Sequence, residues 1–138
     1  MKRMTCLFAV TLAVGIAVGV IGNHVLIAQQ APVTRTILQQ KDLEGAAGRE
    51  VVMYVAELVP GGVAGKHYHP GPELLYILEG SLTLEHDGQS PVTLKGGESA
   101  HIPAKHIHNA KNASATGPSK VLVFLVGEKG QPLATPVQ

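Results

Sequence analysis

The sequence predicts an all-β domain, a β-sandwich or β-barrel, behind an apolar N-terminal segment. From Thr34 onward, apolar residues recur with a period of two, and no stretch sustains the 3.6-residue period of a helix. The 138 residues include 16 glycines and 9 prolines, many of which separate the apolar runs. Glycine and proline form tight turns, so this composition favours many short strands over long helices.

Residues 1–28 are expected to form a secretory signal or a membrane anchor. Two basic residues precede an uncharged apolar run at 7–21, and Ala28 offers a small residue at a cleavage position. The stretch 7–28 also reaches the ~20 residues that a spanning helix needs, which leaves an uncleaved anchor open. We expect an exported protein, periplasmic or secreted, held in the inner membrane only if this segment is retained. The folded domain is then 29–138.

Eight strands are expected in the domain, each bounded by turn residues. Asp87-Gly88, which lies between two of these strands, is a hairpin signal. The run 121–126 is apolar on both faces and is therefore expected at the centre of a sheet. The tail after Gly130 is expected to lie extended along another surface. The eight expected ranges are 34–40, 50–59, 73–79, 81–86, 92–94, 100–102, 106–109 and 121–127.

The charge balance and the cysteine count exclude several classes of function. Eleven Lys and Arg stand against ten Asp and Glu, which gives a formal net charge of +1. We expect no nucleic-acid partner, because phosphate binding needs a concentrated basic face. With Cys6 as the single cysteine, an intrachain disulfide and a zinc site of several thiolates are both excluded.

The histidines are the residues that carry chemistry. Six of the seven lie between His67 and His108, and an HxH pair is followed by a glutamate. In an extended chain His67, His69 and Glu73 share parity, so their side chains are expected to face one interior, with His108 as a third imidazole. Polar groups in a small apolar interior lose hydration, and a divalent cation removes that cost. The alternative is a set of exposed loop histidines.

Two segments resemble the motifs of the cupin superfamily, in its small type-2, RmlC-like form. Residues 61–80 match G(X)5HXH(X)3–4E(X)6G at every fixed position, and residues 97–112 match G(X)5PXG(X)2H(X)3N with one exception. The resemblance implies a single conserved β-barrel, the double-stranded β-helix or jelly roll, often assembled as a homodimer. It also implies four metal ligands, which are His67, His69, Glu73 and His108.

The exception is Lys105, which stands where the second motif has glycine. A left-handed turn at that position costs a lysine about 1–2 kcal/mol more than a glycine, so a turn of another shape is expected.

Other polar residues are expected to lie near the site or to serve structure. His106 competes with His108 as a ligand, and the motif selects His108. His106 is then expected beside the site, where it could assist catalysis together with Glu73, which could accept a proton. The remaining expectations are an exposed or structural His101, a solvated His86, a turn role for Asn112 and core positions for Tyr54 and Tyr76.

The resemblance and the ligand set lead to three hypotheses for function. Three imidazoles and one carboxylate leave two positions open on an octahedral ion, one per chain, with Fe²⁺ or Mn²⁺ favoured and Ni²⁺ or Zn²⁺ as alternatives. The first hypothesis is a metal-dependent, dioxygenase-like oxidoreductase that acts on a small oxygen-rich molecule. The second is a non-catalytic periplasmic module that binds or senses a metal or a small ligand. The third and weakest is a sugar epimerase or isomerase with a histidine base.

Overall fold

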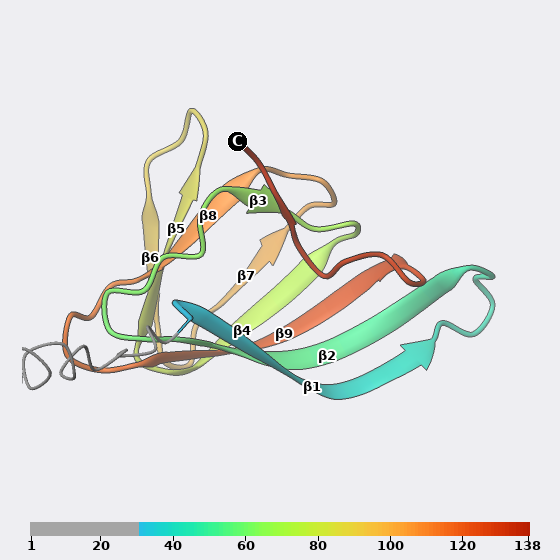
Figure 1. The fold of residues 1–138 in the computed structure, drawn as a ribbon, viewed down its shortest axis with the longest axis horizontal. Coiled ribbons are helices and arrows are strands. Elements are labelled where there is room, and N and C mark those ends of the chain that lie inside the picture. The colour runs from blue at the N-terminus through green and yellow to red at the C-terminus, as the bar shows by residue number, and fades with distance from the viewer. Residues whose placement is uncertain (1–30) are drawn as a thin grey trace, which may run out of the picture. The chain divides into compact units, whose positions relative to one another are not determined.

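The computed structural model describes residues 31–138, which form ten β-strands and no helix (Figure 1). The expected signal or anchor at 1–28 lies outside the described residues. Within the described part of the chain, no helix has the length and apolar character needed to cross a membrane. The strands are β1 (Val33–Asp42), β2 (Arg49–Leu58), β3 (His67–Tyr68), β4 (Glu73–Glu79), β5 (Ser81–His86), β6 (Val92–Lys95), β7 (Ser99–Ile102), β8 (His108–Asn112), β9 (Ser119–Glu128) and β10 (Thr135–Pro136).

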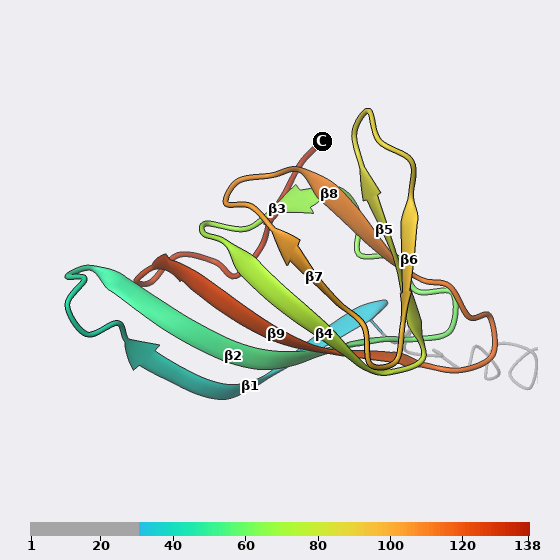
Figure 2. The ribbon, with the colours of Figure 1, turned by 180° about the vertical axis from the view of Figure 1, so that it is seen from behind.

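The strands form two five-stranded antiparallel sheets that face each other (Figure 2). One sheet has the order β1-β2-β9-β4-β7 and the other the order β10-β3-β8-β5-β6. The expected all-β class is confirmed, but no closed barrel is found, because no ladder joins the two sheets among the described strands. The chain changes layers instead. At the Gly96-Gly97 turn, for example, β6 of one sheet leads into β7 of the other.

Most of the expected strands are present, with differences at the site. The Asp87-Gly88 hairpin joins β5 and β6, and β9 lies between β2 and β4, as predicted. The two-residue strands β3 and β10 were not predicted as strands, although β10 is the extended tail pairing with another surface. The expected strand at 106–109 begins later, as β8. Residues 103–107 form a turn first, because the nitrogen of His106 donates to the carbonyl of Pro103 at 3.2 Å.

The core fills the space between the sheets with alternating side chains. On β2 the even-numbered residues from Val52 face inward, and on β9 the odd-numbered residues from Val121 do so, as the period of two requires. Most of the core residues come from the sheet with the order β1-β2-β9-β4-β7. The buried apolar residues are Val52, Tyr54, Leu58, Leu75, Ile77, Leu82, Leu84, Ile102, Val121, Val123 and Leu125.

Asn112 holds the loops at one end of this core together. Its buried amide nitrogen donates to the carbonyls of Val59 at 3.0 Å and Gly117 at 2.8 Å, and its oxygen accepts from the nitrogen of Ser114 at 2.9 Å. Buried polar groups need such partners, so this residue connects three backbone segments. The turn role expected for Asn112 is confirmed.

Candidate metal centre

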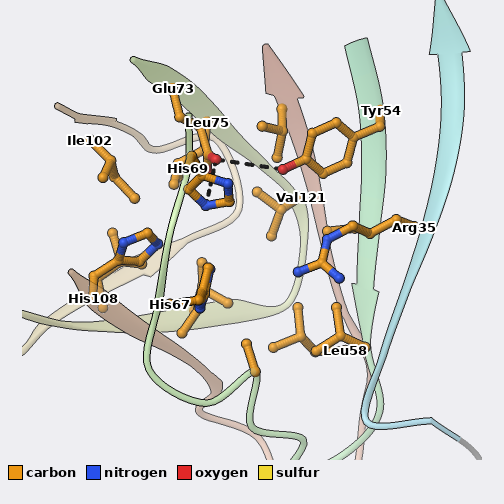
Figure 3. Close-up of a pocket in the computed structure, with 17 residues that line it drawn as sticks. Arg35, Tyr54, Leu58, His67, His69, Glu73, Leu75, Ile102, His108 and Val121 are labelled. Atoms are coloured by element: carbon orange, nitrogen blue, oxygen red, sulfur yellow. Dashed lines mark hydrogen bonds and ion pairs between the residues drawn. The ribbon is translucent and has the colours of Figure 1, made fainter. Parts of the chain in front are cut away.

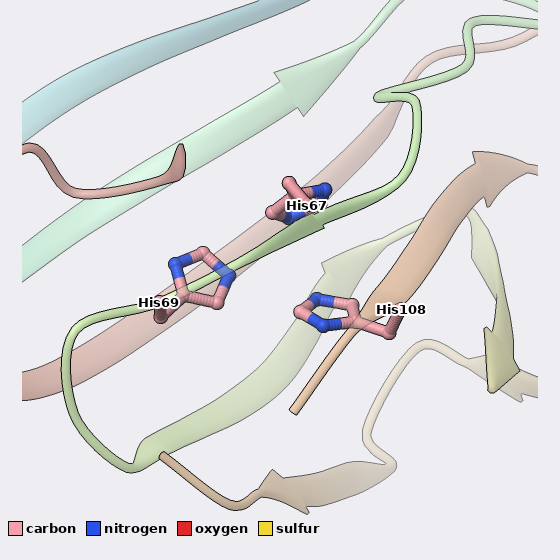
Figure 4. A group of neighbouring side chains, drawn as sticks. All are labelled: His67, His69 and His108. Atoms are coloured by element: carbon pink, nitrogen blue, oxygen red, sulfur yellow. The ribbon is translucent and has the colours of Figure 1, made fainter. Parts of the chain in front are cut away.

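Three histidines that are distant in sequence meet in the interior of the domain. The side chains of His67, His69 and His108 are buried, and each offers a ring nitrogen within 4.8 Å of the other two (Figure 4). The ring centroids of His67 and His108 are 4.4 Å apart, and those of His69 and His108 are 5.2 Å apart. The alternative of exposed loop histidines is wrong for these three residues.

Strand pairing brings the three rings together. His67 in β3 lies directly opposite His108 in β8, in a single antiparallel pair. His69 follows two residues after His67, so its side chain leaves the extended chain on the same side. Figure 4 shows the rings of His67 and His69 on one segment, with the ring of His108 beside them on the neighbouring strand.

A backbone carbonyl fixes the orientation of each imidazole. The Nδ1 atom of His67 lies 2.7 Å from the oxygen of Gly65, that of His69 lies 2.5 Å from the oxygen of Leu133, and that of His108 lies 3.1 Å from the oxygen of His106. A carbonyl only accepts hydrogen bonds, so each Nδ1 donates its proton. In the neutral ring, the lone pair is then on Nε2, which is the arrangement of a metal-binding histidine.

Burial keeps two of the imidazoles neutral. Burial lowers the pKa of His67, and it lowers the pKa of His108 to about 4. The hydrogen bonds to the backbone carbonyls raise both pKa values, but by less than burial lowers them. Burial disfavours the charged form of any group that is taken out of water. At neutral pH these rings therefore keep a free lone pair, as a metal ligand requires.

Glu73 lies against this group without belonging to it. Its Oε2 atom is 2.9 Å from Nε2 of His69, and it accepts a hydrogen bond from the hydroxyl of Tyr54 at 3.5 Å. Burial, and then the charge of Glu73, raise the pKa of Tyr54, so the phenol keeps the proton that it donates. Tyr54 is buried as expected, and its hydroxyl orients the carboxylate.

The donor set fits a divalent cation. Both nitrogens of His69 face acceptors, since Nδ1 meets the Leu133 carbonyl and Nε2 meets the Glu73 carboxylate. A neutral imidazole has one proton for two such contacts. Either a proton shared with the carboxylate or a cation held by Nε2 and the carboxylate satisfies the second contact. Two atoms bound about 2.1 Å from one ion at a right angle lie about 3.0 Å apart, close to the observed nitrogen–oxygen distance.

The other described histidines lie outside the group of three. His101 is exposed on the outer side of β7, as expected. His106 does not join the group of three, and its ring lies against His86, with centroids 4.9 Å apart. The expectation of a solvated His86 is wrong. Its register opposite His108 turns it inward, its centroid is 5.9 Å from that of His108, and its Nδ1 is buried without a partner.

A pocket opens beside the three histidines (Figure 3). Its cavity measures about 40 Å³, and most of its walls are aliphatic. Besides the three histidines, its polar lining consists of Glu73, Tyr54 and Arg35. Arg35 was not singled out from the sequence. The one available signal was its position two residues from each of the apolar residues Val33 and Ile37 in an extended strand.

The sequence places this fold and site in a known family. The model of the Cupin domain family matches residues 54–125, just over half of the 138 residues, including the three clustered histidines. The chain belongs to the cupin family. No curated protein matches this cupin sequence.

Solved structures with the same fold include several enzymes. DMSP lyase DddQ from Ruegeria pomeroyi is 21% identical, with 94% of this chain and 68% of that chain covered and a TM-score of 0.63. The polyketide cyclase RemF from Streptomyces resistomycificus is 26% identical, covering 78% and 72%, with a TM-score of 0.58. A recombinant oxalate oxidase in complex with glycolate is 20% identical, covering 79% and 57%, with a TM-score of 0.60. The names of these three proteins, a lyase, a cyclase and an oxidase, refer to different reactions, so the cupin fold alone does not select one.

Proposed function

We propose that this cupin binds one divalent transition metal through His67, His69, His108 and Glu73, and that it is a dioxygenase-like oxidoreductase. The observation that carries the proposal is the group of three buried imidazoles, each with Nδ1 held by a carbonyl, so that Nε2 is the ligand atom, with Glu73 beside Nε2 of His69. Fe²⁺ or Mn²⁺ suits a mixed imidazole and carboxylate set with open positions, and Ni²⁺ or Zn²⁺ is the alternative. When bound, Fe²⁺ or Mn²⁺ supplies one-electron chemistry and a Lewis acid for a substrate oxygen.

The protein's own groups supply orientation and a proton acceptor. Tyr54 donates to Glu73 and so fixes the carboxylate beside His69. A carboxylate held there is placed to take a proton from a substrate hydroxyl, a role that needs hydrogen-bond reach. We assign an assisting role to His106 for a substrate that extends toward His86, because the His106 ring lies on that side.

The small pocket supports a small substrate. Its cavity measures about 40 Å³ and is partly open to solvent. The aliphatic walls lower the local dielectric, which strengthens polar interactions made beside them. These properties support the small oxygen-rich substrate expected from the sequence.

Metal analysis of single variants tests the site. We expect near-stoichiometric Mn²⁺ or Fe²⁺ in the purified full chain, and loss of at least 90% of it in His69→Ala. His101→Ala is the matched control, because His101 is exposed on the outer side of β7 and should keep the metal. Absence of metal from the wild type, or equal loss in both variants, refutes the proposal.

Oxygen uptake separates the enzyme from the binding module. The iron-loaded full chain should consume oxygen with at least one small hydroxy acid or enol, and His69→Ala should not. The contrary outcome is a protein that retains iron and binds one of these compounds while none of them stimulates oxygen consumption. That result favours the non-catalytic periplasmic binding or sensing module.

Export is part of the proposal and rests on the sequence at 1–28. We expect the mature protein outside the cytoplasm to begin after Ala28. Mass spectrometry of the protein from cell fractions checks this, and an intact N-terminus in the membrane fraction would show an anchor instead.

A further inference from the structure

We propose that Arg35 makes this pocket a site for small carboxylates, with the guanidinium group holding the carboxylate beside the three-histidine centre. This inference rests on the proposed function, since it names the class of molecule that the metal site receives. It concerns a residue of β1 that lies outside both cupin motifs and outside the residues that the family model matches.

Strand register turns Arg35 toward the pocket. Val33 pairs with Leu58 and Arg35 pairs with Ala56 in the ladder of β1 and β2. Leu58 is a core residue and Ala56 packs against the core, so their partners on β1 face the same interior. Figure 3 shows the guanidinium group pointing into the pocket, between the ring of Tyr54 and Leu58 and toward His67.

Arg35 has no anionic partner among the described residues. Four lysines of the same domain each pair with a carboxylate, at distances between 2.7 and 3.1 Å, but no carboxylate lies within ion-pair distance of Arg35. The nearest candidate in the pocket, Glu73, already contacts His69 and Tyr54. The guanidinium group of an arginine without a carboxylate partner matches the geometry of a bound carboxylate.

The charge balance of the pocket calls for an anion. A divalent cation and Arg35 together carry three positive charges, and Glu73 supplies one negative charge. The three imidazoles and Glu73 are buried among aliphatic side chains, where uncompensated charge is costly, whereas Arg35 is exposed and supplies its charge from the solvent side. A bound carboxylate reduces the excess positive charge, and Arg35 is the group of the lining that would hold it. The pocket is small and partly open, so carboxylates with short chains are the fitting class.

A structural role for Arg35 is the competing explanation. β1 is an edge strand, and a charged residue that points inward on an edge strand discourages pairing with other chains. That role predicts more self-association when the charge is removed, and no change in ligand preference.

Calorimetric titration of the Mn²⁺-loaded full chain distinguishes the two roles. The probes are glycolate and its neutral isostere glycolamide. We expect the wild type to bind glycolate at least tenfold more tightly than glycolamide, Arg35→Met to lose this preference, and Arg35→Lys to keep part of it. Lys41→Met is the matched control, because Lys41 carries the same charge on the same strand and lies outside the pocket lining. It should keep the full preference.

Metal content is measured in every sample, so that the two proposals fail separately. A wild type without Mn²⁺ refutes the metal site. A wild type that holds Mn²⁺ but binds glycolate no better than glycolamide overturns the carboxylate class. If the preference survives in Arg35→Met, or in Arg35→Gln should Arg35→Met not fold, the assignment of Arg35 is wrong.

Discussion

Lys105 shows how a single residue keeps the site in shape. It has a φ of 58°, in the left-handed region, and its nitrogen donates to the carbonyl of His69 at 3.0 Å. The expectation of a turn of another shape is therefore wrong. The lysine adopts the conformation of the glycine that it replaces, because this turn holds the backbone of a clustered histidine.

Replacing Lys105 with glycine should stabilise the domain. The left-handed conformation costs a lysine about 1–2 kcal/mol, and the greater freedom of glycine in the unfolded chain offsets part of the gain. We expect Lys105→Gly to raise the free energy of unfolding by about 0.5–1 kcal/mol in urea titrations. Lys95→Gly, in a strand without positive φ, should lower it by a similar amount. A destabilised Lys105→Gly would contradict this account.

At the residue scale, the three clustered histidines could be predicted and Arg35 could not. His67 and His69 share parity in a motif of fixed spacing, so the sequence carries the signal for their common direction. Arg35 is one cation in a polar strand, and its role depends on a pairing with Ala56 across the sheet. The inward turn of His86 depends in the same way on its register against His108.

At the element scale, the loop between β3 and β4 is shaped by a close backbone contact. A Cβ atom added to Gly71 would lie 1.6 Å from the carbonyl oxygen of Val126, which is too close for any side chain. Gly71 therefore lets the loop pack on the end of β9. The same loop carries His69 at its start and leads into Glu73, so its path sets the distance between them.

Gly71→Ala should damage both stability and metal binding. The loop has to move away from β9, which separates His69 from Glu73 and removes packing contacts. We expect the free energy of unfolding to fall by about 2 kcal/mol or more, as for overpacked sites. Urea titration and metal analysis measure the two effects. Gly96→Ala is the control, because nothing lies within 4 Å of a Cβ atom there. Equal behaviour of the two variants would show that the contact is not limiting.

The sequence did not predict the strands that are defined only by pairing with another strand. β3 and β10 contain two residues each, too few to show a period, and they are strands because Thr135 pairs with Tyr68. The longer strands β4 and β5 were predicted with their observed bounds, since alternation and flanking glycines define them locally.

At the scale of the whole domain, the outer face of the sheet containing β4 and β9 is apolar. Leu74 is 60% exposed and Phe124 is 44% exposed, and the two residues lie opposite each other on these strands. Charged residues lie toward both ends of the face, with Arg49 opposite Glu128 on one side and Glu57 opposite Lys120 on the other. An apolar centre with a charged rim is typical of protein interfaces. Tyr76, expected in the core, lies on this face, 45% exposed.

The homodimer expected from the sequence should use this face. Both ends of the face carry charges of both signs, so charged residues of two copies related by a two-fold axis can pair at either end. We expect a dimer by sedimentation velocity and a shift to monomer in Phe124→Lys. Val92→Lys, at an exposed valine of the other sheet, should leave the dimer intact. A wild type that is monomeric at all concentrations would refute the expectation.

The fold class could be predicted because glycine and proline mark most strand ends, whereas sheet closure could not. Whether the strands form one barrel or two sheets depends on which edges pair, and β1, β6, β7 and β10 remain edges of their sheets. No local pattern in the sequence records that choice.

The carbonyl that orients His69 belongs to Leu133, 64 residues further along the chain. During synthesis, the His69 imidazole therefore lacks this hydrogen-bond acceptor until residue 133 has left the ribosome, long after the histidine itself has emerged. We therefore expect the proposed ion to be bound only after translation is complete. The ions present in the compartment where folding ends, rather than those around the ribosome, would then determine which metal is bound.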